Sequence, residues 1–395
     1  MIGQTDPRSS VSDMQVFRTF LTVILLCAIL AGCTLPETVP PGTQQGGTPG
    51  NSPDLPAGST GSPPVVADTA SPRAYITFVI NVNDWVHPDE YADTILRLVD
   101  IFEHYKVRGD FYFTAEITRC YVEQYPDVIE RLKNSAMTIS YHVRPPHPLY
   151  TGFDQRLQNL GDAALYQTLL DYETYALDLG TGDLDRSHQG GYTYVAHVFG
   201  RNPVVAPAPN NDPRIKNAAW QVYASLGVQM TLLYHEEGTD PYQPYVFMDG
   251  LLVRPSDFSV TRTTEVNGRD DFWWNYMTGP DAALYDPSTL LQSGLAEWES
   301  HAYGRPPFVT SLIHENNYYR SGAEAWSAYY FVMEQSRKTD PLAPPFDLNA
   351  PDPSQLRPTR EQDAIWNAYE NLVAWAAANL QVVTSEDILR LAGEP

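Results

Sequence analysis

The stretch Ala74–Trp85, AYITFVINVNDW, decides the fold prediction. It begins as an apolar run rich in β-forming residues and ends in the polar side chains Asn81, Asn83 and Asp84. A buried strand that ends in polar groups is typical of α/β proteins, in which the carboxyl ends of parallel strands carry the active site. We therefore expect a strand over 75–82 and a functional site at its carboxyl end.

Apolar runs and helical patterns alternate along the rest of the chain. The segments that follow are a helix over 89–105, a strand over 109–114, a helix over 126–133 and a strand over 136–141. The pattern continues to a strand over 308–313 and a last helix over 385–392, with helices also expected over 159–179 and 321–337. Roughly seven or eight strand–helix units fit one closed (β/α) barrel, and a doubly wound open sheet fits the same pattern.

Two histidines follow the predicted strand over 136–141. His142 comes directly after this strand, and His147 lies across a proline-rich loop. With Asp84, these imidazoles would give one divalent metal ion three protein ligands, which leaves a position open for water and substrate. Zinc is the first candidate, and cobalt, nickel and manganese accept the same ligands. A single histidine is more often a packed or surface residue, so the metal prediction depends on all three residues meeting.

His314 ends the predicted strand over 308–313 and should face the same edge of the sheet. A histidine in this position can protonate a leaving group or stabilise the oxyanion of a tetrahedral intermediate. The alternatives are a fourth metal ligand and a buried, hydrogen-bonded histidine.

The first part of the chain has the composition of an export signal. Phe20–Ala31 is apolar, follows Arg18 and is too short to cross a bilayer comfortably. The run Leu30-Ala31-Gly32-Cys33 resembles the bacterial lipobox, in which the cysteine sulfur takes the lipid. We therefore predict a signal peptide with a lipobox over 1–33 and lipidation of Cys33, with an ordinary cleaved signal or an anchor as the alternative.

A linker and a folded domain are expected after the signal. Residues 34–72 are rich in Pro, Gly, Ser and Thr and contain no aromatic residue, Lys or Arg, so they should remain disordered. The folded domain then spans 73–395, and of the three cysteines only Cys120 falls inside it. The net charge of −23 argues against a nucleic acid as partner. These features predict a lipid-anchored protein of a bacterial cell envelope, outside the cytoplasm.

The order of an aspartate on the first strand, a histidine pair after the third and a late strand ending in histidine resembles a known family. It is similar to the polysaccharide deacetylases with a NodB-homology domain, the carbohydrate esterase family 4 type. Gly109–Thr114, GDFYFT, is similar to the second strand of that family, and Val382–Ile388 to its closing segment. The resemblance implies a (β/α)7-type barrel, a divalent metal and hydrolysis of N- or O-acetyl groups on glycans.

The resemblance also implies roles for particular residues. It makes Asp84, His142 and His147 the metal ligands and His314 the catalytic histidine. The implied function is a metal-dependent hydrolase that removes acetyl groups from a cell-envelope or extracellular polysaccharide.

The chain departs from the family pattern at the general base. The first motif of the family usually has two adjacent aspartates, the first of which is the base, and Asn83 stands at that position here. The histidine pair is also one residue wider apart than usual. Asp257, Glu315 or Asp271 could supply the base, and no spacing argument selects among them. Asp257 is the residue that we assign beside His314.

Aromatic side chains are candidates for sugar binding. Trp85 and Trp273 could stack on sugar rings, with Asn83 as a further substrate contact, and ordinary packing is the alternative for both tryptophans.

Two other functions fit the same features. The first is a non-catalytic glycan-binding lipoprotein on the same barrel, which the replacement of the base by Asn83 favours. The second is a glycoside hydrolase on a related barrel, which needs two carboxylates flanking one bond. Asp84 with Asp257 or Glu315 would be that pair.

Overall fold

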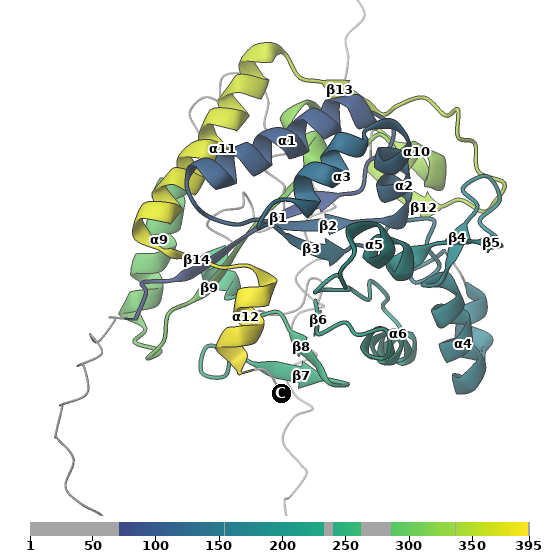
Figure 1. The fold of residues 1–395 in the computed structure, drawn as a ribbon, viewed down its shortest axis with the longest axis horizontal. Helices are drawn as coiled ribbons and strands as arrows, with labels where there is room; N and C mark the ends of the chain where they lie inside the picture. The colour runs from purple at the N-terminus through teal and green to yellow at the C-terminus, as the bar shows by residue number, and fades with distance from the viewer. Residues whose placement is uncertain (1–70, 154, 233–239, 262–285, 336, 394–395) are drawn as a thin grey trace, which may run out of the picture. The chain divides into compact units, whose positions relative to one another are not determined.

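The computed structural model describes residues 71–153, 155–232, 240–261, 286–335 and 337–393, all within one compact unit, Asp68–Pro395 (Figure 1). The predicted signal peptide, the linker up to residue 70, Cys33 and Trp273 lie outside the described residues. Within them, no helix has the length and apolar character that a bilayer crossing requires.

Strand β1 (Tyr75–Val82) lies inside a parallel sheet. Along one side it pairs with β9 (Phe308–His314), and along the other with β2 (Asp110–Phe113) and the short β14 (Gln381–Val382). β3 (Thr138–Tyr141) pairs with β2. All these pairings are parallel, so the ends of β1, β2, β3 and β9 meet at one edge, as the sequence predicts.

Backbone hydrogen bonds extend the sheet beyond β3. Tyr141 N donates to Val205 O at 2.8 Å, and Val205 forms a parallel bridge to Met230 at the start of β6 (Met230–Thr231). β6 pairs in parallel with β8 (Leu251–Val253), on which β7 (Val246–Met248) lies antiparallel.

The structure shows a mixed α/β fold with a parallel sheet. Within the described residues it does not show the complete closed barrel that the sequence predicts. Between β8 and β9 the described residues contain a backbone bond, from Asp257 N to Phe308 O at 2.7 Å, and no continuous ladder of strand pairs.

The helices next to the sheet have clear sequence signals. α1 (Pro88–His104) begins with Pro88, has Asp89 and Glu90 in its first turn and buries an apolar stripe. α2 (Ala115–Gln124), for which the sequence pattern predicts no helix, is capped by Thr114, whose hydroxyl accepts a hydrogen bond from Ile117 N at 3.3 Å. Further helices are α3 (Pro126–Lys133), α5 (Gly191–Phe199), α6 (Pro213–Ser225), α7 (Phe258–Thr261), α9 (Pro287–Ser300), α11 (Thr359–Asn379) and α12 (Ser385–Ala392), with 3₁₀ turns η1 (Gln155–Asn159) and η4 (Glu315–Tyr318).

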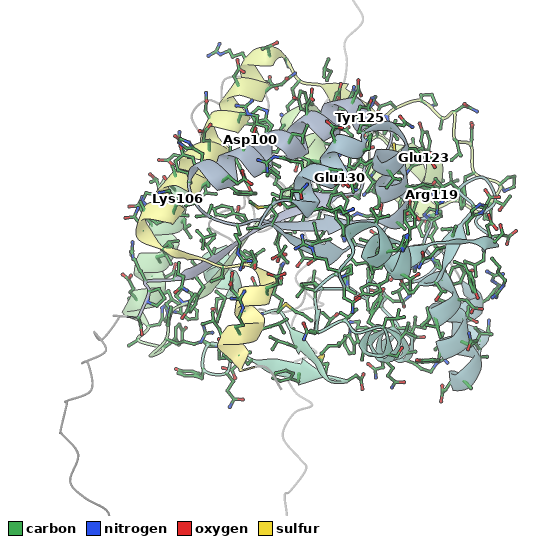
Figure 2. All side chains as sticks on the ribbon, in the orientation of Figure 1. Asp100, Lys106, Arg119, Glu123, Tyr125 and Glu130 are labelled. Carbon is green, nitrogen blue, oxygen red and sulfur yellow. The ribbon has the colours of Figure 1, made fainter. Side chains whose placement is uncertain are left out.

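Charged side chains on the outer face of these helices are exposed. Asp100 on α1 and Glu130 on α3 are examples, and Figure 2 labels both. The apolar faces of the same helices pack against the sheet and form the main hydrophobic core.

The helix predicted over 159–179 is only partly correct. α4 (Asp162–Tyr172) ends early, and the chain continues as a hairpin of β4 (Tyr175–Leu177) and β5 (Leu184–Gln189). The turn between these strands contains Gly182 at φ +76°, a backbone conformation that favours glycine.

The helix predicted over 321–337 is wrong. This region contains β10 (Arg320–Gly322), the short α10 (Ser327–Tyr330) and β11 (Phe331–Glu334), which pairs with β12 (Arg337–Pro341), while β13 (Ser354–Leu356) pairs with β10. Its aromatic residues pack together with Phe346 from the following loop instead of forming one helical stripe. We call this group the aromatic layer, and its buried members are Trp326, Tyr329, Tyr330, Phe331 and Phe346.

Candidate functional site

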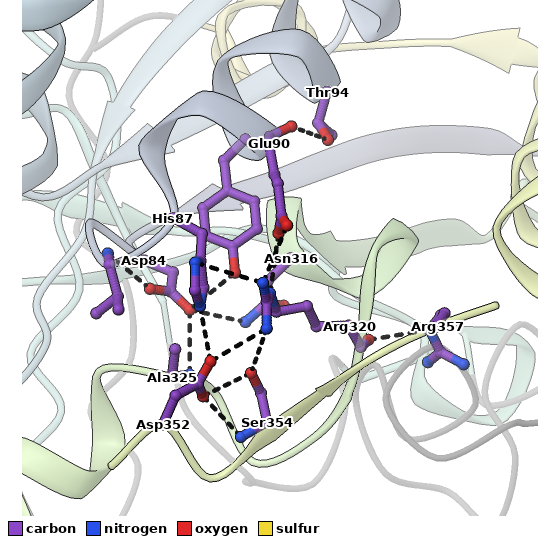
Figure 3. Close-up of polar contacts among 12 residues, drawn as sticks. Asp84, His87, Glu90, Thr94, Asn316, Arg320, Ala325, Asp352, Ser354 and Arg357 are labelled. Carbon is purple, nitrogen blue, oxygen red and sulfur yellow. Dashed lines mark hydrogen bonds and ion pairs between the residues drawn. The ribbon is translucent and has the colours of Figure 1, made fainter. Parts of the chain in front are cut away.

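Asp84 lies buried just beyond the end of β1. One carboxylate oxygen accepts a hydrogen bond from Val86 N at 3.1 Å. The other accepts from Tyr91 OH at 3.4 Å, Asn316 Nδ2 at 3.4 Å and Ala325 N at 3.2 Å (Figure 3). Burial is the main reason why the pKa of Asp84 rises to about 6.

Glu315 holds the backbone at the same strand end. Its Oε1 atom accepts hydrogen bonds from Asn83 N at 2.7 Å and from Asp84 N at 2.5 Å. Burial, and then the neighbouring Asp84, raise the pKa of Glu315 well above its ordinary value. The buried side-chain amide of Asn83 has no hydrogen-bond partner among the described residues.

His314, the last residue of β9, is paired in register with Asn81 of β1. Its Nε2 atom lies 2.6 Å from Arg144 Nη2 and 3.2 Å from Asn81 Nδ2. Because guanidinium and amide nitrogens only donate, this arrangement favours the tautomer of His314 in which Nε2 accepts.

Glu324 brings several charges together beside His314. Its carboxylate lies 3.4 Å from His314 Nε2, 3.2 Å from Lys338 Nζ and 3.9 Å from Arg144 Nη2. Burial alone would raise the pKa of Glu324, but Lys338, His314 and Arg144 outweigh it and hold the pKa at about 2. Glu324 is therefore ionised at neutral pH.

His142 follows β3 and is buried, with its ring edge-to-face against Tyr112 at a centroid distance of 6.5 Å. Neither of its ring nitrogens has a hydrogen-bond partner in the described part of the chain. Burial, with smaller effects of Arg144 and His314, lowers its pKa well below the ordinary value, so the ring is neutral at physiological pH. A buried polar group without a partner calls for an explanation, and an unseen ligand or water is one.

His147 lies in a second, adjoining group. Its Nδ1 accepts from Leu149 N at 3.3 Å, and its Nε2 lies 3.4 Å from Glu173 Oε1. Burial lowers the pKa of His147 to about 4, although the carboxylate of Glu116 acts in the opposite direction. Burial also raises the pKa of Glu173 to about 7.

The predicted metal ligands Asp84, His142 and His147 are not linked to one another by direct contacts in the described part of the structure. Among the described residues, no hydrogen bond or ion pair links Asp84 to His142 or His147, and no group of three or more His, Cys, Asp and Glu side chains is placed to hold a metal ion. The neutral imidazoles suit a metal, but the oxygens of Asp84 already accept hydrogen bonds from protein groups. A carboxylate oxygen that accepts hydrogen bonds can still bind a metal, so the set of three stays a prediction.

Asp257 lies away from the predicted catalytic histidine. Both of its oxygens pair with Arg305, at 2.7 and 2.8 Å, and one also accepts from Phe308 N at 2.7 Å. Phe308 begins β9 and His314 ends it, which separates them by roughly 20 Å along the strand. Asp257 therefore cannot act beside His314, and we correct that assignment. Its visible role is to hold the start of β9.

Trp85 packs against Tyr329 at a centroid distance of 5.5 Å and remains partly exposed. Part of its ring is thus available at the surface. The other predicted sugar contact, Trp273, and the candidate base Asp271 lie outside the described residues.

Glu173 and Glu324 are absent from the site that the sequence predicts. Neither follows a predicted strand: Glu173 follows α4, and Glu324 lies in the segment wrongly predicted as a helix. We use the name carboxyl-edge cluster for the group at the ends of β1, β3 and β9, which comprises the half-buried Arg144 and the buried Asn81, Asp84, His142, His314 and Glu324.

No protein-family model and no curated protein matches this chain. Solved structures similar to it include one described as a polysaccharide deacetylase from Mycobacterium smegmatis, with 13% identity, coverage of 83% of this chain and 92% of that chain, and a TM-score of 0.43. A 4-alpha-glucanotransferase from Thermococcus litoralis has 10% identity, coverage of 81% and 40%, and a TM-score of 0.40. The peptidoglycan deacetylase PdaC from Bacillus subtilis has 11% identity, coverage of 80% and 92%, and a TM-score of 0.33. Likenesses this distant carry no argument about activity, so the function is argued from the site.

Proposed function

We propose that this chain is a hydrolase that removes acetyl groups from a polysaccharide, with the carboxyl-edge cluster as its reaction site. One observation supports this most directly. His142 is buried and neutral, has no hydrogen-bond partner among the described residues and lies near Arg144 and His314. Because burying an unpaired polar group costs free energy, such a side chain is best explained by a substrate or water that completes its hydrogen bonds.

In the proposed reaction a water molecule attacks the acetyl carbonyl. The neutral ring of His142 accepts the proton of this water, and the guanidinium of Arg144 stabilises the negative charge on the carbonyl oxygen. The bond from the acetyl carbon to the sugar nitrogen or oxygen then breaks. The proton that His142 took from the water passes to Nε2 of His314 while the other ring nitrogen of His314 releases its proton to the leaving amine or alcohol, so the products are acetate and the free sugar group.

We also propose that the protein binds a divalent metal, with zinc as the first candidate. This proposal depends only on the kind of ligand atoms that the chain offers. The neutral rings of His142 and His147 are the nitrogen ligands that zinc accepts. No step of the proposed reaction is assigned to the metal.

Acetate release tests this function. The full chain is incubated with acetylated chitooligosaccharides or acetylated xylan, and acetate is measured. We expect release by the wild type, loss of release in His142→Ala, and normal release in the matched control His104→Ala, whose ring is exposed on α1. Thermal unfolding of both variants shows whether they fold. Equal release by both folded variants would contradict the proposed role of His142.

A second candidate, a glycan-binding protein without hydrolysis, is favoured by Asn83. Its unpartnered amide stands where the related family has its base, and an amide can hydrogen-bond a sugar hydroxyl but cannot take a proton at neutral pH. Glycan binding by the wild type without any acetate release would select this candidate. Release of reducing sugar without acetate would contradict both and indicate a glycoside hydrolase.

The cellular location belongs to the same proposal. The predicted signal peptide and the predicted lipidation of Cys33 support an extracytoplasmic protein attached to a bacterial membrane by lipid, where polysaccharides of the envelope are within reach. The acidic net charge of −23 makes a nucleic-acid substrate unfavourable.

A further inference from the structure

Arg254 is a half-buried arginine that comes directly after β8. β8 pairs in parallel with β6, which continues the sheet from β3 through Val205, so Arg254 lies at the same edge as the carboxyl-edge cluster. Its Nη1 atom donates to Tyr112 OH at 2.8 Å, and its Cζ atom lies 5.7 Å from the centre of the Tyr112 ring. Tyr112 therefore holds the guanidinium against β2.

The strand register places Tyr112 in one row with two residues of the carboxyl-edge cluster. Asn81 of β1 is paired with Tyr112 on one side and with His314 on the other. Paired residues of neighbouring parallel strands point to the same face of the sheet, and the strands are about 4.8 Å apart, so the α-carbons of Tyr112 and His314 are roughly 10 Å apart. The guanidinium of Arg254 thus lies on the same face as the proposed reaction site.

Arg254 has no acidic partner among the described residues. These residues give it the hydroxyl of Tyr112 and no ion pair, and its buried Nε–H group has no acceptor among them. Another half-buried arginine, Arg305, is paired with Asp257. The chain has 48 acidic and only 25 basic residues, so no shortage of acids explains the difference. A half-buried cation in this position is best explained by a ligand that supplies the negative charge.

Asp110, two residues before Tyr112 on β2, is the alternative partner. Burial raises the pKa of Asp110, and the charge of Arg254 acts in the opposite direction. However, its oxygens accept hydrogen bonds from Ser385 and Ser140, and in the described part of the chain no ion pair joins it to Arg254. Asp110 therefore balances the charge of Arg254 from a distance and does not occupy its N–H groups.

A carboxylate matches the donors that Arg254 offers. A guanidinium has parallel N–H groups that bind both oxygens of a carboxylate, and these charge-assisted bonds are about twice as strong as neutral ones. We propose that Arg254, held by Tyr112, binds a carboxylate group next to the proposed reaction site. This carboxylate is either the acetate that hydrolysis releases or an acidic substituent of the polysaccharide. The choice between these two sources rests on the proposed function, and the binding of a carboxylate does not.

Calorimetric titration of the full chain tests this site with acetate and glucuronate and with their neutral counterparts, acetamide and glucose. We expect a carboxylate to bind about tenfold or more tightly than its neutral counterpart. Arg254→Met should abolish this preference, and Arg254→Lys, which keeps the charge without the paired N–H groups, should keep part of it. The matched control is Arg201→Met, at a half-buried arginine that donates to Met137 O at 2.8 Å, just before the start of β3 and thus at the opposite edge of the sheet.

The two carboxylates distinguish the sources. A stronger preference for acetate over acetamide indicates that the site holds the product of hydrolysis. A stronger preference for glucuronate over glucose indicates that it holds an acidic group of the polysaccharide. Either result, when it depends on Arg254, supports the site.

Equal affinity for both carboxylates and their neutral counterparts would overturn the proposal, and this comparison needs only the wild type. An equal effect of Arg254→Met and Arg201→Met, with both variants shown to be folded by thermal unfolding, would overturn it as well. Carboxylate binding that depends on Arg254 without any acetate release leaves this site standing and removes the hydrolysis. Acetate release without a preference for carboxylates does the reverse.

Discussion

Arg144 Nη2 lies 2.6 Å from His314 Nε2, and this contact joins the loop after β3 to the end of β9. The guanidinium always donates, so it fixes which nitrogen of His314 accepts and how the ring is turned. The same Arg144 is the proposed partner of the carbonyl oxygen. The two roles make it the most informative position for mutation.

Replacing Arg144 by Met should lower kcat for acetate release by about 100-fold, because the oxyanion loses its charged donor and His314 loses its orientation. The matched control is Arg131→Met. Arg131 forms exposed ion pairs with Asp100 and Glu103, and such pairs contribute little to stability. A similar kcat in both variants would remove Arg144 from the proposed reaction.

Replacing Glu324 by Gln should lower the free energy of unfolding by about 3 kcal/mol at neutral pH, because Lys338 and Arg144 lose a buried counter-charge. The pKa of Glu324 is held at about 2, below its ordinary value, so its contribution is present above about pH 4.5 and is lost as pH falls toward 2. Urea unfolding of both proteins at several pH values checks this. A difference between them that does not shrink in acid would contradict the assignment.

The raised pKa of Asp84 predicts that its effect on stability changes with pH in the direction opposite to that of Glu324. Because the folded protein holds this proton up to about pH 6, the carboxyl group costs stability as pH rises from about 4 to 6, by up to about 3 kcal/mol. Asp84→Asn should lack this component. Urea unfolding of the two proteins across the window measures the difference, and parallel pH profiles would show that Asp84 ionises normally.

Zinc uptake tests the predicted ligand set residue by residue. We expect binding by the dialysed wild type to be lost in His142→Ala and in His147→Ala, whose imidazoles are neutral, and retained in Asp84→Ala, whose carboxylate already accepts protein hydrogen bonds. Elemental analysis after equilibration measures the bound ion. Loss of zinc in Asp84→Ala would mean that Asp84 exchanges its partners for the metal, and no uptake by the wild type would end the metal proposal.

Lipidation of Cys33 predicts where the chain is found in a bacterial host. Cys33→Ser should move it from the membrane fraction to the soluble fraction of the envelope, while Cys27→Ser, inside the apolar core of the signal, should leave it with the membrane. Immunoblotting of the fractions decides this. Equal distribution of the two variants would contradict a lipid on Cys33.

The strands at the centre of the sheet could be predicted because each has a strong local signal. β1 and β9 are apolar runs that end in polar residues, and parallel pairing then requires Asp84, His142 and His314 to lie at one edge. Nothing local shows which way their side chains turn. Asp84 is held by Asn316 and Ala325, which come from more than 200 residues further along the chain.

The region after β9 was harder to predict because its structure also depends on contacts with residues outside the segment. The aromatic residues between Trp326 and Phe331 have a spacing that also suits a helix, and their packing partner Phe346 lies outside this segment, in the loop after β12. Glu324 sits within that segment and therefore had no strand-end signal. Asp257 shows the opposite error, since its place after β8 suggested the carboxyl edge but Arg305 and Phe308 hold it elsewhere.

Glu315 accepts hydrogen bonds from the backbone N–H groups of Asn83 and Asp84, and this buried carboxylate limits which residues can replace Asn83. Introducing an aspartate through Asn83→Asp would crowd a third acid beside two whose pKa values are already raised. The new group would take up a proton instead of supplying a base, since like charges in a buried site cannot all ionise. A neutral amide at position 83 is therefore compatible with the neighbouring acids Asp84 and Glu315. For an aspartate at position 83 to act as a base, the same variant would also have to replace Glu315 by a neutral residue.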